Sequence, residues 1–143
     1  MDKMDNIRAG VVTSLPEVLQ SRYEELRRKV IEAWAFALAQ AGIESIDDMP
    51  AQAAPEYPPL KEGQGSQSGH FRGVGLIAQG IADALEKIHP NLKIDRDLLW
   101  ACALCHDLGK PFEMCPRNQA RWKCYIAAHC YRAIRHAAYG VYV

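Results

Sequence analysis

The feature that most constrains this chain is a histidine beside an aspartate at the end of an apolar helical pattern, in the string CHDLGK at residues 105–110. The residues before it are apolar on nearly every side of a helix, which predicts a central, buried helix. Adjacent helical residues point about 100° apart, but at a helix end His106 and Asp107 can both turn toward one ion beyond the terminus. We expect Gly109 to stop the helix in a left-handed conformation and Pro111 to keep it from resuming. The string therefore predicts a helix end that presents a histidine and a carboxylate to a cation.

Cys102, Cys105 and His106 also form a C-x-x-C-H pattern, which can attach haem or serve zinc or redox chemistry. Haem attachment of this type goes with export, and residues 1–10 are charged without an apolar core, so no signal peptide is visible. The five cysteines are an odd number, which predicts reduced thiols in the cytoplasm rather than a disulfide framework. We therefore interpret both cysteines of the pattern as small buried apolar residues.

The length of 143 residues suits one domain with its own core. No apolar run approaches the roughly 20 residues that a membrane-spanning helix needs. We expect a cytoplasmic protein without membrane association.

Apolar residues recur at helical spacing in the N-terminal half after residue 13, whereas residues 1–13 give little signal. A long helix is predicted with Ser14 as its cap, Pro16 in its first turn and Gly42 near its end. Residues 43–69 are rich in proline and glycine and predict a long connection, either an active-site cover or a linker. The apolar stripe of the first helix is Leu19, Tyr23, Leu26, Val30, Trp34 and Leu38.

A second helix is predicted with Ser68 as a plausible cap, and it opens its apolar stripe with His70. A lone histidine on such a stripe is usually a satisfied core residue, and only a partner elsewhere makes it a ligand. A third helix, with Asp95 as its cap, then leads to the histidine–aspartate pair. The rest of the second stripe is Val74, Ile77, Ile81, Leu85 and Ile88.

The C-terminal quarter is basic although the formal net charge is zero, and its only acidic residue is Glu113. A last helix is predicted from about Gln119 to the end of the chain. The cations and aromatic residues are interspersed: Lys110, Arg117, Arg121, Lys123, Arg132 and Arg135 with Trp122, Tyr125, Tyr131 and Tyr139. The mixture suits a phosphate or a nucleotide base, and a solvated helix face explains it equally well.

The order of these residues, His70 and then HDLGK at residues 106–110, resembles the HD-domain superfamily of metal-dependent phosphohydrolases, which are all-helical enzymes. The resemblance implies an all-α fold, an HD-domain-like helical bundle that is incomplete at its C-terminal end. Residues 1–68 would form an N-terminal helix and the proline- and glycine-rich connection. Residues 69–143 would form the HD-like metal-binding helical core, the two parts making one compact domain overall.

The resemblance also implies roles for single residues. His70, His106 and Asp107 match the first three metal ligands of the superfamily, and His136 matches the additional histidine of members that hold two metals. Lys110 matches a lysine near the substrate phosphate or the second metal. Imidazole and carboxylate donors suit a divalent manganese, iron, nickel or zinc ion with open positions for water and substrate.

The implied reaction is hydrolysis of a phosphomonoester or phosphodiester, such as a nucleotide, by a metal-activated water. Asp107 would be a ligand and a proton acceptor, while Lys110 with Arg132 or Arg135 would bind the substrate and offset charge on the phosphate oxygens. The expected partner is a small phosphate ester or nucleotide. Nucleic acid stays open but is not favoured, and the sequence does not determine the oligomeric state.

One part of the superfamily pattern has no match here. Members close the metal site with an aspartate on a later helix, whereas Glu113 is the only carboxylate after Asp107. We expect either that the C-terminal part of the domain is missing or that the chain is a degenerate member. Two alternatives to hydrolysis therefore remain: a di-iron oxygenase, suggested by His136, and a non-catalytic HD module.

Overall fold

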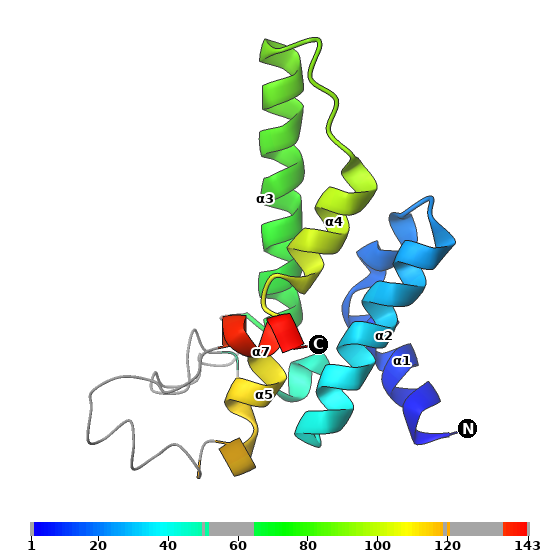
Figure 1. The fold of residues 1–143 in the computed structure, drawn as a ribbon, viewed down its shortest axis with the longest axis vertical. Coiled ribbons are helices and arrows are strands. Elements are labelled where there is room, and N and C mark those ends of the chain that lie inside the picture. Colours follow the sequence, from blue (N-terminus) through cyan, green and yellow to red (C-terminus); the bar gives the residue numbers. More distant parts are fainter. Residues whose placement is uncertain (1, 50, 52–64, 119, 121–135, 143) are drawn as a thin grey trace, which may run out of the picture.

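A computed structural model describes residues 2–49, 51, 65–118, 120 and 136–142. In this part of the chain all regular elements are helical, which confirms the predicted all-α class (Figure 1). In chain order they are α1 (Lys3–Ser14), η1 (Pro16–Gln20), α2 (Glu24–Ala41), η2 (Ile46–Asp48), α3 (Gln67–Ile88), α4 (Arg96–Cys105), α5 (Lys110–Met114) and α7 (His136–Tyr142). Among the described helices, none combines the length and the apolarity needed to cross a membrane. Most of the predicted connection and of the predicted last helix lie outside the described residues.

The N-terminal region differs from the prediction of one long helix that begins at Ser14. Residues 3–14 form α1, and Ser14 is its last residue rather than a cap. The chain then turns at Leu15, and Pro16 opens the short 3₁₀ helix η1 before α2 begins at Glu24. Helix α1 was missed because only Ile7 and Val11 give it a buried apolar stripe. The predicted end of α2 is confirmed, because Gly42 has a φ of 72° and closes the helix in the left-handed conformation.

The core is centred on Trp34 of α2, whose side chain is fully buried. Its Nε1–H donates a hydrogen bond of 3.1 Å to the Leu104 carbonyl at the end of α4. Its ring lies 5.0 Å, centroid to centroid, from Phe71 at the start of α3. The core therefore ties α2 to the end of α4 and to the start of α3. The other buried apolar residues of this cluster are Ile7, Val11, Leu15, Val18, Val30, Ala35, Ala37, Leu38, Ile46, Met49, Leu108, Phe112 and Met114.

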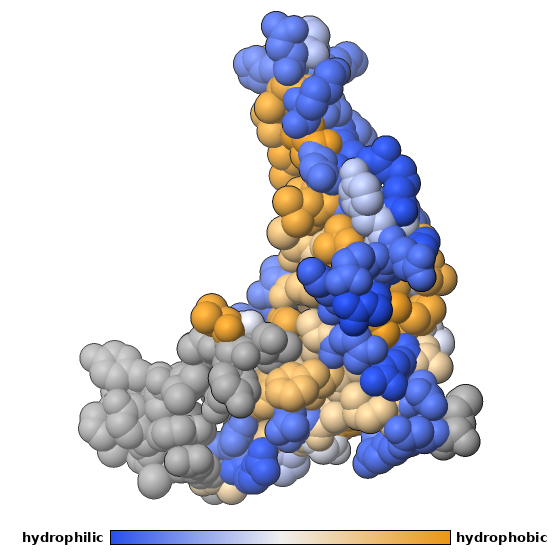
Figure 2. Space-filling model, turned by 45° about the vertical axis from the view of Figure 1, so that its right-hand side comes forward, coloured by the Kyte–Doolittle hydropathy of each residue, from blue (hydrophilic) through white to orange (hydrophobic). Residues whose placement is uncertain are grey.

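Helices α3 and α4 pack against each other at Gly75, where a Cβ atom would lie 2.1 Å from the ring of Trp100. The start of α3 is capped by Ser66, whose hydroxyl accepts from the Gly69 N–H, two residues before the predicted cap. The predicted apolar stripe of α3 is largely exposed along the upper part of the molecule (Figure 2). The exposed members of the stripe are Ile77, Ile81, Leu85 and Ile88.

Helix α4 is less buried than its composition predicts. Asp95 caps it as expected, by accepting from the Leu98 N–H at 3.0 Å. Leu98, however, is 53% exposed, and Cys102 is exposed as well. Cys105 is partly buried, and burial raises the pKa of its thiol to about 12. Cys102 is therefore not the buried residue that we predicted, whereas Cys105 is an inert thiol.

The turn after α4 also differs from its prediction. Gly109 has a φ of −80°, so it does not stop the helix in a left-handed conformation. Pro111 does not prevent a new helix either, since α5 begins one residue before it, at Lys110. Proline is tolerated there because the first N–H groups of a helix have no intrahelical partner. The turn thus separates two helices, and the histidine–aspartate pair lies at its start.

Candidate metal centre

Three potential ligands converge from two helices. His70 lies in the first turn of α3, and His106 and Asp107 follow the last residue of α4. Because α3 and α4 pack side by side, the start of one helix lies beside the end of the other (Figure 1). The predicted partner that would make His70 a ligand is therefore present.

The donor atoms form a triangle with equal edges. His70 Nε2 lies 3.3 Å from His106 Nε2, and each of these nitrogens lies 3.3 Å from Asp107 Oδ2. Two ligands at 2.0–2.1 Å from a metal lie about 2.8–3.4 Å apart when their angle at the metal is roughly 90–110°. The triangle therefore fits one face of a metal coordination shell, and these three residues could hold an ion.

A hydrogen bond determines which nitrogen of His106 is available to bind a metal. Its Nδ1 lies 2.7 Å from the Ala103 carbonyl oxygen, which can only accept, so Nδ1 carries the hydrogen. This leaves Nε2 as the atom that faces the other two donors. Metal-ligating histidines in proteins usually have such a partner on their second nitrogen, because it fixes the tautomer and the ring orientation.

The charges around Asp107 keep it ionised. Burial would by itself raise the pKa of this carboxyl, but hydrogen bonds from His106 and Lys110, with the positive charge of Lys110, hold it well below its usual range. Burial, and next the charge of Lys110, lower the pKa of His70, whereas the hydrogen bond to Asp107 raises the pKa of His106. The site thus offers a carboxylate and a neutral His70 imidazole at neutral pH, both of which are metal ligands.

Lys110 lies beneath the carboxylate rather than at the surface. Its side chain is 5% exposed, and its Nζ lies 2.9 Å from Asp107 Oδ2 and 3.2 Å from Gln67 Oε1. The same ammonium lies 5.5 Å from the centre of the Phe71 ring. The predicted contact of Lys110 with substrate stays a prediction. Sequence reasoning did not identify Gln67, because a glutamine ahead of a histidine carries no distinctive signal.

The fourth predicted ligand, His136, lies on the other side of Asp107. Its Nε2 lies 3.0 Å from Asp107 Oδ1, whereas His70 and His106 approach Oδ2. Its Nδ1 lies 2.5 Å from Oε2 of Glu113, the residue in which sequence reasoning saw only an unmatched carboxylate. The two predicted substrate-binding arginines, Arg132 and Arg135, lie outside the described residues.

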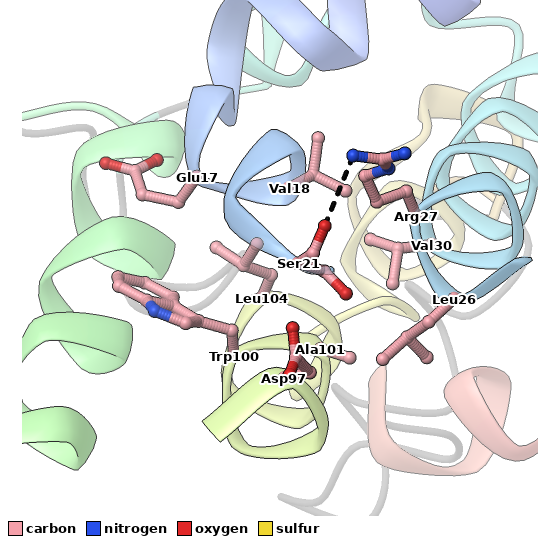
Figure 3. Close-up of a pocket in the computed structure, with 10 residues that line it drawn as sticks. All are labelled: Glu17, Val18, Ser21, Leu26, Arg27, Val30, Asp97, Trp100, Ala101 and Leu104. Atoms are coloured by element: carbon pink, nitrogen blue, oxygen red, sulfur yellow. Dashed lines mark hydrogen bonds between the residues drawn. The ribbon is translucent and has the colours of Figure 1, made fainter. Parts of the chain in front are cut away.

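A separate cavity lies between η1, α2 and α4 (Figure 3). Its wall includes Ser21, Asp97 and Trp100, and Arg27 crosses it to donate a hydrogen bond of 3.2 Å to the Ser21 carbonyl. None of the residues that line it is a candidate metal ligand. The cavity is therefore distinct from the histidine–aspartate cluster.

Comparison with known proteins matches the part of the chain that carries the candidate ligands. The HD domain family model matches residues 68–139, which is half of the chain and includes His70, His106, Asp107 and His136. Dihydroneopterin 2',3'-cyclic phosphate phosphodiesterase of Methanocaldococcus jannaschii is 33% identical over 99 residues, which are 65% of this chain and 37% of that enzyme. The chain thus spans little more than a third of the length of this relative, and no solved structure matches it. A family match over half of the chain, on a helical fold that brings the motif residues together, shows that this chain belongs to the HD domain family.

Proposed function

We propose that this chain is a metal-dependent phosphohydrolase that uses a divalent ion held by His70, His106 and Asp107. The observation that carries the proposal is the triangle of donor atoms with 3.3 Å edges. Manganese, iron, nickel and zinc all accept imidazole and carboxylate ligands in such a set.

A divalent ion at this site supplies a bound water of lowered pKa and polarises a phosphoryl oxygen. The residues of the chain then have separate tasks. Asp107, kept ionised by its contact with Lys110, would be a ligand of the ion. The side chain of His70 is 47% exposed, so the triangle opens to solvent and a phosphate ester can reach it.

We favour a phosphodiester, and specifically a small cyclic one, over a phosphomonoester. The archaeal relative is named for its action on a 2',3'-cyclic phosphate, and the shared segment covers 65% of this chain. In the hydrolysis of a cyclic diester, water forms one new phosphorus–oxygen bond as one phosphorus–oxygen bond of the ring breaks, and the leaving oxygen stays on the product as a hydroxyl group beside the monoester.

The test is hydrolysis of 2',3'-cyclic AMP and bis(p-nitrophenyl) phosphate by the purified chain with Mn²⁺, Fe²⁺, Ni²⁺ or Zn²⁺. We expect metal-dependent hydrolysis that His106→Ala reduces to background. His89→Ala is the matched control, because His89 is an exposed histidine at the far end of α3. Hydrolysis that persists in His106→Ala would refute the proposal, and absence of hydrolysis with every metal would favour a non-catalytic HD module.

A di-iron oxygenase is the second candidate, favoured by one observation. His136 approaches Asp107 Oδ1, so Asp107 has imidazoles near both of its oxygens, as a carboxylate shared by two ions would. Oxygen consumption by the Fe²⁺-loaded chain separates the two candidates, since phosphoester hydrolysis consumes no oxygen.

A further inference from the structure

Glu113 on α5 is a buried carboxylate in contact with the last candidate ligand. Its side chain is 4% exposed, and its Oε2 lies 2.5 Å from Nδ1 and 3.1 Å from the backbone nitrogen of His136. On the opposite edge of the same ring, Nε2 lies 3.0 Å from Asp107 Oδ1. The imidazole of His136 thus bridges Glu113 and Asp107.

The chemistry of these groups determines which nitrogen of His136 carries the hydrogen. A carboxylate accepts hydrogen bonds and donates none, so Glu113 takes the hydrogen on Nδ1 of His136. Nε2 is then the nitrogen directed at Asp107. A second bond, from the His136 backbone N–H to the same Glu113 oxygen, fixes the start of α7 together with the ring. The side chain therefore sets both the tautomer and the orientation of His136.

Gly109 holds α7 in the same place by a different means. A Cβ atom on Gly109 would lie 1.7 Å from the His136 carbonyl oxygen and 2.7 Å from the Gly140 nitrogen. Since the φ of Gly109 is −80°, its backbone does not require glycine, and the close approach of α7 does. The turn that carries Asp107 and the helix that carries His136 thus meet backbone to backbone.

We propose that Glu113 is a positioning residue that presents His136 as a third imidazole ligand on the Oδ1 side of Asp107. The inference rests on the proposed metal site and deepens it. Glu113 is the only acidic residue after Asp107 in this chain, and it acts one imidazole away from the ion instead of binding it. Carboxylates in this position raise the basicity of the histidine and fix its ring, and their loss costs about 10–100-fold in metal affinity.

The experiment uses Co²⁺ as the probe ion and needs no activity. The full chain and the variants Glu113→Ala, Glu113→Gln and His136→Ala are titrated with Co²⁺, and X-ray absorption counts the imidazoles on the bound ion. We expect three imidazoles in the wild type and two in both alanine variants, with affinity about 10–100-fold weaker in Glu113→Ala. Glu113→Gln should keep three, because its amide oxygen still accepts the Nδ1 hydrogen.

The double variant Glu113→Ala/His136→Ala tests whether the two residues act as one unit. If Glu113 acts only through His136, the double variant binds Co²⁺ as His136→Ala does. A further loss of affinity in the double variant, or an unchanged imidazole count in Glu113→Ala, would overturn the proposal. Should Glu113→Ala not fold, Glu113→Leu takes its place, since an apolar side chain of similar size fills the buried position but cannot accept the Nδ1 hydrogen.

Two outcomes in the wild type separate this inference from the proposed function. A wild-type chain that binds Co²⁺ with only two imidazoles overturns the role of Glu113 and leaves the His70, His106 and Asp107 site intact. A wild-type chain that binds no Co²⁺ overturns both.

Discussion

Replacing Gly75 by alanine tests how the packing of α3 on α4 builds the metal centre. The new Cβ would lie 2.1 Å from Cζ3 and 2.7 Å from Cε3 of Trp100. Carbon atoms in van der Waals contact are about 3.5–4.0 Å apart, so relief needs a local movement of roughly 1.4–1.9 Å. Either α3 moves away from α4, or the indole ring leaves its place between them.

Both movements carry a cost that can be estimated. Overpacking of this kind lowers the free energy of unfolding by about 1–3 kcal/mol. Gly80→Ala is the matched control on the same helix, because a Cβ there has no atom within 4 Å. An unstrained glycine-to-alanine change in a helix stabilises by about 0.4–1 kcal/mol. The two variants should therefore differ by about 1.4–4 kcal/mol, with Gly75→Ala the less stable.

Urea unfolding followed by circular dichroism measures this difference. For an m value of about 1.5 kcal/mol/M, the two unfolding midpoints should lie roughly 1–3 M apart. Because α3 carries His70 and α4 leads to His106, Gly75→Ala should also weaken Co²⁺ binding, while Gly80→Ala leaves it unchanged. Equal midpoints for the two variants would refute the claim that Gly75 sets the distance between the helices.

Other predictions concern the core, the charges and the thiols. Trp34→Phe removes the hydrogen bond to the Leu104 carbonyl and should cost about 1–3 kcal/mol in urea unfolding; no loss would mean that this bond does not support the end of α4. Mn²⁺ at 100 times its Kd should add about 2.7 kcal/mol to the free energy of unfolding, a gain that EDTA removes and that a thermal melt detects. Hydrogen bonds from the backbone N–H and then the guanidinium of Arg22 lower the pKa of Asp97, so the folded pKa lies below the unfolded value of about 3.9. The stabilisation that ionised Asp97 gives the folded state is complete above the unfolded pKa and is lost as the pH falls through the folded pKa. Asp97→Asn should therefore lower the free energy of unfolding at pH 7 and lower it progressively less in acid. Burial raises the pKa of Cys105 to about 12, so iodoacetamide at pH 8 should leave this thiol unmodified in the folded chain, as mass spectrometry would verify.

Local signals in the sequence were reliable where one residue type performs one local task. Gly42 closes α2 in the left-handed conformation, and Asp95 caps α4, as both residue types predict. Gly109 shows the limit of the same reasoning. Its place after an apolar helix is typical of a helix stop, but its φ of −80° is open to any residue. A glycine is needed there because the backbone of α7 lies against it at His136, which is 27 positions further along the chain. A contact between distant segments leaves no trace in the local pattern.

Apolar periodicity likewise identified an amphipathic helix without identifying what covers it. The period of three and four residues on α3 predicted its helical form correctly. Ile77 and Ile88 on this stripe are nevertheless 66% and 69% exposed, while the start of the helix is buried around Phe71. Periodicity reports which residues share a face, and burial depends on whether another element packs on that face.

The types and order of the residues were enough to identify the HD motif, the all-α class and the four histidine and aspartate candidates, because metal chemistry restricts which side chains can serve as ligands. The packing of α3 on α4 decided that His70 meets His106 and Asp107 at 3.3 Å, and that Lys110 is buried beneath the carboxylate. The docking of α7 decided that Glu113 contacts His136. These features depend on distances between segments that are far apart in the sequence, and only the folded chain sets those distances.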